Sequence, residues 1–387
     1  MKIAKNVNNL GTELVYDIFS KTKKLENEGK KIIDLSLGQS AESPPEHVIE
    51  ATIKALRDGN NGYTVPNGIL ECREAVSRKI QKLYNAKVSP DRIFIMPGGK
   101  PTMHYAISFF GEPGTEIVYP DPGFPIYESM INYTGAKPVP YNLTDENNFN
   151  INVEKILSLI NDKTRLFIIN NPHNPTGSFA EKSVIDKLAA GLSKFPNLAI
   201  LSDEIYGRLI FEKKDFPTFL NYPDLYDRLI ILDGWSKSYA MTGWRLGWGI
   251  WPEKLLNKMF KFCVNNHSCV NAAIQYGAIA ALDGPDDSIN NMVDKFIKRK
   301  NLMCDGLKKI SGIKFTEARS GFFIFPNVKD TGMNGDQFAE KCLNEAGVAL
   351  IQGTAFGKFS LDNVRINFTT SEENITQALD NIKKMLS

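Results

Sequence analysis

The chain has 387 residues, of which 42% are hydrophobic, 10% aromatic and 23% charged. This length and composition indicate a globular protein with about two core-bearing units and exclude both a disordered chain and a miniature scaffold. Lysine plus arginine number 46 and aspartate plus glutamate 44, so the net charge of +2 argues against nucleic acid or an anionic membrane as a partner.

The sequence carries no signal for a membrane or for secretion. No apolar run approaches the roughly 18 residues needed to span a bilayer, and the first residues lack the apolar stretch of a secretory signal. The five cysteines are scattered, and with only four histidines they form no cluster with metal-ligand spacing. We therefore expect a cytoplasmic protein with reduced thiols and no metal site.

The predicted elements alternate between strands and helices. From about residue 92, short apolar, β-branched runs recur between longer stretches with helical spacing. These runs are residues 92–96, 116–119, 165–169, 198–201 and 229–232. Such alternation predicts βαβ units around a buried parallel sheet.

The pattern changes after residue 285. A long charged stretch with helical spacing, residues 288–310, is followed by strand-like runs and a terminal helix. The strand-like runs are residues 321–325, 348–351 and 364–368. We predict a smaller α+β unit whose strands pair with the early run KIIDLSL, residues 31–37. The expected division is a large domain, residues 41–284, and a small discontinuous domain, residues 1–40 and 285–387.

Polar residues gather where the predicted strands end. Five such clusters read PGGKP, PDPGFP, NNPHNPTG, SDEIYG and DGWSKS. Because ligands of open α/β sheets bind outside the carboxyl ends of the strands, we expect the functional site there. The sequence has no G-x-G-x-x-G, P-loop, HExxH or GxSxG motif, so dinucleotide, P-loop, zinc-protease and α/β-hydrolase interpretations lose their usual support.

Lys237 lies in the last of these clusters, in a stretch that contains all four tryptophans of the chain. A lysine surrounded by apolar rings loses hydration, which lowers the pKa of its amine and frees the nucleophile that Schiff-base chemistry requires. Considered alone, Lys237 could equally be a surface lysine in a loop.

The motif around Lys237 has a wider context. SKSYAMTGWRLGW resembles the cofactor-lysine signature of the fold type I, pyridoxal-phosphate-dependent aminotransferases of class I and II. Five further motifs appear in family order along nearly the whole chain, namely NGYTVPNG, PGGKPTM, PDPGFPIYES, NNPHNPTG and SDEIYG. The resemblance implies an α/β fold with a large domain, whose mostly parallel central sheet is flanked by helices, and a smaller α+β domain. It also implies that Lys237 forms the internal aldimine with pyridoxal 5′-phosphate.

The resemblance gives further residues a role at the cofactor ring. Asp203 would pair with the pyridine nitrogen and keep it protonated, while Asn174 and Tyr206 would donate hydrogen bonds to the phenolic oxygen and Phe124 would stack on the ring face. Each also has a plainer interpretation when considered alone. Asp203 could cap the following turn, Asn174 could serve its own turn, and Phe124 could belong to the core or a lid.

Phosphate binding is predicted at the glycine pair after residues 92–96. Gly98 and Gly99 precede a helix whose first turn can take a proline, so free backbone N–H groups would point at an anion. We select Gly99 and Lys100 as phosphate-binding residues. Arg245 adds a fixed cation by the resemblance, with a buried structural ion pair as the alternative.

One position departs from the family pattern. Gly234 stands three residues before the lysine, where many relatives have a phosphate-binding serine. Ser236 or Ser238 could replace that serine, and we select Ser236.

Substrate binding and assembly also follow from the resemblance. Arg365 matches the arginine that holds the substrate α-carboxylate with a bidentate fork, although a lone strand arginine is ordinarily a solvated residue. Gly38 would let the backbone approach that carboxylate, and Asn174 would share in binding it. The residue matching Tyr63 reaches the cofactor phosphate of the neighbouring subunit, which implies a homodimer with shared active sites.

The predicted activity is transfer of the amino group of an L-amino acid to a 2-oxo acid by a ping-pong mechanism through the Lys237 aldimine. A C–S lyase or β-decarboxylase on the same fold is the alternative, and a non-catalytic ligand sensor is a distant third.

The substrate side chain stays open. No arginine lies between Arg245 and Arg299, so a dicarboxylate donor would need another cation, and Lys100 is the candidate. Aromatic, branched and small neutral donors are equally compatible. The segment TELVYDIF, residues 12–19, could cover the mouth of the site or be an ordinary packed helix.

Overall fold

The computed structural model describes residues 1–212 and 214–387. Its centre is a seven-stranded sheet with the strand order β2-β8-β7-β6-β5-β3-β4. The strands are β2 (Ile93–Met96), β3 (Glu116–Asp121), β4 (Lys137–Asn142), β5 (Thr164–Asn170), β6 (Ala199–Asp203), β7 (Leu229–Gly234) and β8 (Gly247–Ile250). β8 runs antiparallel to both of its neighbours, and the pairs from β7 to β4 are parallel. The expected mostly parallel sheet is therefore confirmed.

Two strands of this sheet were not expected from the sequence. β4 contains two prolines, which an edge strand tolerates because one side of its backbone has no partner. β8 has the sequence GWGI, and its two glycines interrupt the apolar pattern by which the other strands are recognised. Both strands form because of their packing and their position in the sheet. Local sequence patterns do not indicate either of these.

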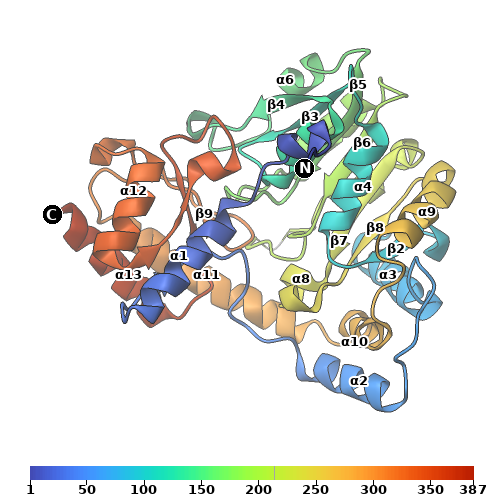
Figure 1. The fold of residues 1–387 in the computed structure, drawn as a ribbon, viewed down its shortest axis with the longest axis horizontal. Coiled ribbons are helices and arrows are strands. Elements are labelled where there is room, and N and C mark those ends of the chain that lie inside the picture. Colours follow the sequence, from blue (N-terminus) through green and yellow to red (C-terminus); the bar gives the residue numbers. More distant parts are fainter. Residues whose placement is uncertain (213) are drawn as a thin grey trace.

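Helices cover both faces of the sheet (Figure 1). The helices of this part of the molecule are α2 (Glu46–Arg57), which packs on α10, and α3 (Leu70–Tyr84), α4 (Lys100–Phe110), α5 (Ile126–Thr134), α6 (Val153–Ser158), α7 (Lys182–Leu192), α8 (Trp235–Ser238), α9 (Leu256–Asn266) and α10 (Ala272–Asp283). Successive strand residues point to opposite faces: Leu166 and Ile168 of β5 pack in one hydrophobic cluster, and Phe167 and Ile169 in another. Burial on both faces explains why these strands are apolar throughout.

The C-terminal part builds a separate small sheet system. It comprises α11 (Asp287–Leu307), β9 (Phe323–Ile324), α12 (Gly335–Lys341), β10 (Val348–Ala349), β11 (Ile351–Gln352), β12 (Val364–Asn367) and α13 (Glu372–Leu386). β11, β12 and β9 form an antiparallel sheet, and β10 pairs in parallel with β1 (Ile33–Asp34). The early run at 31–37 therefore pairs with a strand of the C-terminal part, as predicted. A third hydrophobic cluster joins these strands to α11 and α13.

The N-terminal segment takes a different course from β1. Residues before α1 (Leu14–Asn27) lie against α5, where the Gly11 amide donates a hydrogen bond of 2.9 Å to the Ser129 hydroxyl. α1 then runs toward the C-terminal part, as its blue ribbon shows (Figure 1). The start of α1 is thereby held between the two parts of the molecule.

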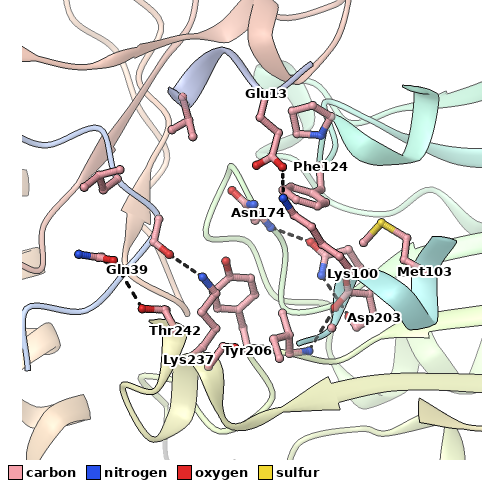
Figure 2. A pocket seen from close by; sticks show the side chains of 18 of the residues that line it. Glu13, Gln39, Lys100, Met103, Phe124, Asn174, Asp203, Tyr206, Lys237 and Thr242 are labelled. Carbon is pink, nitrogen blue, oxygen red and sulfur yellow. Dashed lines mark hydrogen bonds and ion pairs between the residues drawn. The ribbon is translucent and has the colours of Figure 1, made fainter. Parts of the chain in front are cut away.

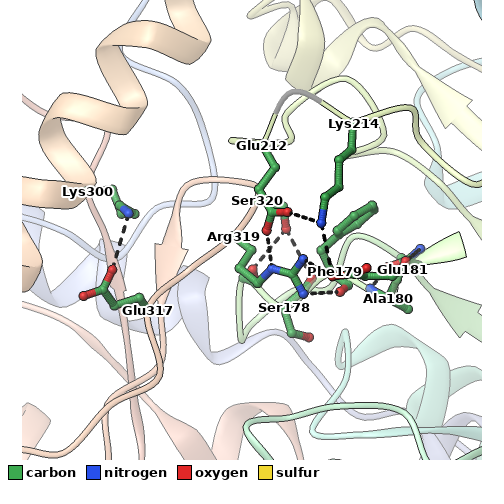
Figure 3. A network of polar contacts seen from close by, with 12 residues as sticks. Ser178, Phe179, Ala180, Glu181, Glu212, Lys214, Lys300, Glu317, Arg319 and Ser320 are labelled. Carbon is green, nitrogen blue, oxygen red and sulfur yellow. Dashed lines mark hydrogen bonds and ion pairs between the residues drawn. The ribbon is translucent and has the colours of Figure 1, made fainter. Parts of the chain in front are cut away.

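A polar network joins loops of the sheet-bearing part to the C-terminal part (Figure 3). The Arg319 guanidinium donates to Glu212 at 2.5 Å and to Glu181 at 2.8 Å, and Lys214 lies 2.8 Å from the same Glu212. Next to Arg319, the Ser320 hydroxyl donates to the Gly177 carbonyl at 3.1 Å. These contacts fix the turn that follows Asn174. Among the residues described, no helix combines the length and apolar character needed to cross a membrane.

Candidate active site

A cavity of about 420 Å³ lies at the carboxyl ends of β5, β6 and β7, between the central sheet and the C-terminal part. Figure 2 shows its side chains, which come from the sheet, α4, α8 and the N-terminal segment. The predicted site residues that line it are Gly38, Gly99, Lys100, Phe124, Asn174, Asp203, Tyr206, Ser236, Lys237, Arg245 and Arg365. The structure therefore brings together residues from seven separate stretches of sequence.

Lys237 projects into this cavity from α8, directly after β7. Its half-buried amine donates a hydrogen bond of 2.5 Å to the Gly38 carbonyl. Burial is the largest cause that lowers the pKa of Lys237 to about 8, and the positive charges of Arg365 and Arg245 lower it further. Near physiological pH a larger fraction of this amine is therefore neutral than for an ordinary lysine.

The aromatic environment of Lys237 differs from the sequence-based expectation. None of the tryptophans lines the cavity; Trp235 and Trp248 pack edge to face in the core, with ring centroids 4.5 Å apart. The ring near the lysine is Phe322, whose centroid lies 5.8 Å from Nζ. Trp235 points away because it precedes Lys237 by two residues on a helix, where such neighbours face different sides.

Asp203 ends β6 and is buried beneath the cavity. Its carboxylate accepts a hydrogen bond of 2.6 Å from the Tyr127 hydroxyl and a second from the Ile205 amide at 3.3 Å. Burial raises the pKa of Asp203 to about 6, against the opposing effects of these hydrogen bonds and of Lys237. Tyr127 was not singled out from the sequence, since its position toward Asp203 depends on how α5 packs on the sheet.

Arg365 is buried on β12 and faces the same cavity. It donates to the Asn174 side-chain oxygen at 3.0 Å and to the Ser36 carbonyl at 2.7 Å, and its guanidinium lies 4.3 Å from the Phe323 ring centroid. Burial lowers the pKa of Arg365 to about 10, so the group remains cationic at neutral pH. Two of its five N–H donors make these bonds, which leaves others for a carboxylate.

Tyr206 and Phe124 are aromatic residues that line the cavity. Tyr206 is buried and meets Phe322 and Phe323 edge to face, at 5.7 Å and 6.0 Å between ring centroids. Burial raises the pKa of the Tyr206 phenol while the Arg365 charge opposes that rise. The phenol is therefore a neutral hydrogen-bond donor.

The predicted phosphate end combines a glycine turn with a cation. Gly98 has φ of +90°, and a Cβ there would lie 2.3 Å from an Arg245 guanidinium nitrogen. Arg245 is exposed at the cavity edge and donates to the Thr242 carbonyl at 2.6 Å. This exposure excludes the buried ion pair considered as its alternative role. Of the two serines weighed as substitutes, Ser236 lines the cavity and Ser238 does not.

Lys100 begins α4, but its side chain turns toward the mouth of the cavity. Its amine forms an ion pair with Glu13 and lies 5.7 Å from the ring centroids of both Tyr16 and Phe124. Glu13 was missed in the sequence, since nothing local connects it with Lys100. Two roles were considered for the segment 12–19, a packed helix and a cover for the mouth of the site. It packs as a helix through Ile18, and its first turn also lines the cavity.

Tyr63 stands apart from these residues. Its side chain is 96% exposed, in the loop between α2 and α3, and it does not line the cavity of its own chain.

Three comparisons place the chain among known proteins. The sequence profile of the family described as aminotransferase class I and II matches residues 30–382. An aspartate aminotransferase of Pyrococcus abyssi is 33% identical over 92% of this chain and 92% of its own. A (5-formylfuran-3-yl)methyl phosphate transaminase of Methanocaldococcus jannaschii is 32% identical over 100% of both chains. The solved aspartate aminotransferase of Rhizobium meliloti has a TM-score of 0.94 at 27% identity, covering 100% of this chain and 99% of that one.

The fold and the site together define a fold type I, pyridoxal-phosphate-dependent enzyme. The chain belongs to the class I and II aminotransferase family, and it is a pyridoxal-phosphate-dependent aminotransferase.

The residues at the site fit this cofactor. Asp203 offers a buried carboxylate of the kind that pairs with a ring nitrogen, and Lys237 offers an amine of lowered pKa in the same cavity. The Arg245 guanidinium packs against Gly98, which is possible because Gly98 lacks a Cβ, and this places the cation close to Gly99 at the N-terminus of α4. A carboxylate, an amine and an anion cradle are the donor set that pyridoxal phosphate requires.

Proposed function

We propose that this enzyme transfers the amino group of an L-amino acid to a 2-oxo acid by a ping-pong mechanism, with Lys237 as the lysine that carries the cofactor. The observation that carries this proposal is that Lys237, Asp203 and Arg365 line one cavity, in which burial lowers the pKa of the Lys237 amine. A neutral amine is both the nucleophile and the proton carrier that transamination needs.

When bound, pyridoxal phosphate supplies an electron sink for the electron pair of the substrate Cα–H bond. Asp203 would keep the ring nitrogen protonated, and the Tyr127 hydrogen bond supports Asp203 in its ionised form. Tyr206 and Asn174 would donate hydrogen bonds to the ring oxygen, and Phe124 would pack on the ring face. The phosphate would be held by Gly99, Lys100 through its backbone amide, Ser236 and Arg245.

Arg365 orients the substrate. Its unused N–H donors take the α-carboxylate in a bidentate fork, which sets the direction of the Cα–H bond. The hydrogen bonds to Asn174 and Ser36 and the stacking on Phe323 already hold the guanidinium in place. Gly38 lets the backbone approach the same carboxylate. The Lys237 amine would be the group that accepts and carries the proton of the substrate Cα.

We also propose a cytoplasmic homodimer with shared active sites. Tyr63 supports this, because an aromatic side chain that is 96% exposed and remote from its own cavity suits a role in a neighbouring copy. The free cysteines support a cytoplasmic location. We further propose a division into domains at residues 40 and 285, which is supported by the hydrophobic cluster that unites β1 with C-terminal elements.

The half-reaction without an oxo acid tests this proposal. Single amino acids added to the holoenzyme should abolish the yellow absorption and release one equivalent of 2-oxo acid per site. Lys237→Ala should still bind the cofactor but lose turnover by roughly 10³-fold or more, because it removes nucleophile and proton carrier together.

The control variant is Lys54→Ala, which removes an exposed lysine of the surface pair with Asp58. It should behave as the unmodified enzyme. Catalytic release of ammonia and pyruvate from a β-substituted amino acid would instead support a lyase. Full activity of Lys237→Ala would overturn the assignment of this lysine.

A further inference from the structure

The ion pair between Glu13 and Lys100 lies inside the active-site cavity. Both residues line it, although they are far apart in the chain, and the Glu13 side chain is only 12% exposed (Figure 2). The segment that carries Glu13 is anchored, since the neighbouring Gly11 amide donates to the Ser129 hydroxyl of α5 at 2.9 Å. Glu13 is therefore a fixed part of the cavity wall.

Among the described residues, the cations that line the cavity are Lys100, Lys237, Arg245 and Arg365. Three of them have roles in the proposed reaction. Lys237 attaches the cofactor, Arg245 binds the phosphate and Arg365 binds the substrate α-carboxylate. The side chain of Lys100 is the remaining cation that a second substrate carboxylate could use. Glu13 already occupies it with a carboxylate that belongs to the protein itself.

We propose that Glu13 is a specificity-determining residue, which neutralises Lys100 and makes the site select amino acids with uncharged side chains over aspartate and glutamate. This inference rests on the proposed function, because it takes Arg365 as the site of the α-carboxylate. The relatives named aspartate aminotransferases act on a dicarboxylate by their names, so the inference separates this chain from them.

The physical argument is one of charge and solvation. A donor with a second carboxylate must either break the Glu13–Lys100 pair or place its own negative charge beside Glu13 in a half-enclosed cavity, where like charges repel strongly. An uncharged side chain meets neither obstacle. The surrounding wall suits such a side chain, because Leu14, Tyr16, Met103 and Phe124 present apolar surface around the pair.

Glu13→Gln tests the proposal by removing the charge while keeping the size of the side chain. The rate constant divided by the dissociation constant is measured for the half-reaction of the holoenzyme with L-aspartate and with L-leucine. The unmodified enzyme should favour leucine. In Glu13→Gln the aspartate-to-leucine ratio should rise roughly 10-fold to 100-fold, because Lys100 becomes free for a charge-assisted hydrogen bond.

A second variant and a binding measurement assign the gain to Lys100. Adding Lys100→Met to Glu13→Gln should cancel the increase, since the two residues act as one pair. Calorimetric titration with succinate, which does not react, should show tighter binding to Glu13→Gln than to the unmodified protein. This readout is independent of turnover.

Glu26→Gln is the matched control, because Glu26 forms an exposed pair with Lys23 on the same helix. It should leave the ratio unchanged. The proposal is overturned if the unmodified enzyme favours aspartate, or if Glu13→Gln changes neither the ratio nor succinate binding. A holoenzyme that reacts with no amino acid at all would instead refute the proposed function.

Discussion

The floor and the mouth of the active-site cavity are built in different ways. The floor is made by strand ends and by the turns that follow them, and its residues Asp203, Lys237 and Gly99 lie next to fully buried strands. The mouth is made by Glu13 and Tyr16 of the N-terminal segment and by the Lys100 side chain, which meet from distant parts of the chain. From this comparison we infer that residues of the floor determine the rate of the reaction. Residues of the mouth then determine which substrate is selected.

The largest expected effect comes from the floor. Asp203→Ala removes the buried carboxylate that we propose pairs with the cofactor ring nitrogen, and it should slow the half-reaction by about 10²-fold to 10³-fold. The loss should be equal for every donor, because Asp203 does not contact the mouth. Stopped-flow absorption with leucine and aspartate measures both rates. A change in donor preference without a loss of rate would contradict the division between floor and mouth.

A smaller effect is expected from pH. The pKa of Lys237 is lowered to about 8, and only the neutral amine attacks an aldehyde. Capture of added pyridoxal phosphate by the cofactor-free protein should therefore accelerate with rising pH and level off above about pH 8. Arg365→Leu removes a positive charge that lowers this pKa, so its midpoint should move to higher pH. A midpoint that stays fixed in the variant would show that the Arg365 charge does not reach Lys237.

The smallest effect is expected for Tyr127, whose hydroxyl supports Asp203 in the floor of the cavity. Tyr127→Phe removes the hydrogen bond of 2.6 Å to Asp203, so the pKa of Asp203 should rise above its value of about 6. The free energy of unfolding should fall by about 1–2 kcal/mol, as urea denaturation can measure. Activity at pH 8 should change little, because Asp203 stays largely ionised there. Tyr222→Phe, which removes a partly exposed hydrogen bond to Asp186, provides the comparison.

Most of the fold followed from local patterns, and the exceptions have physical reasons. The strands β5, β6 and β7 contain uninterrupted apolar runs, at residues 166–169, 199–201 and 229–232, and these runs identify them from the sequence. β4 and β8 contain prolines or glycines and depend on their neighbours for their structure. The pairing of residues 31–37 with the C-terminal part was predicted, although its register could not be.

The candidate site divides in the same way. The residues at strand ends belong to motifs, so the sequence placed Asp203, Asn174 and Lys237 in one site. Tyr127 and Glu13 reach that site only through the packing of α5 and α1, which no pattern within the chain specifies. The prediction that tryptophan rings surround Lys237 was wrong for a related reason. Two residues that are close in sequence can face different sides of a helix.

The pairing of Ile33 with Val348 has a consequence for synthesis of the chain. β1 leaves the ribosome early, yet its partner strand is made only near the end of translation. At about 5–20 residues per second, β1 waits on the order of half a minute, with its hydrogen-bonding edge unpaired. The central sheet can form during this time, whereas the C-terminal part and the cavity mouth are completed only after the ribosome has nearly finished.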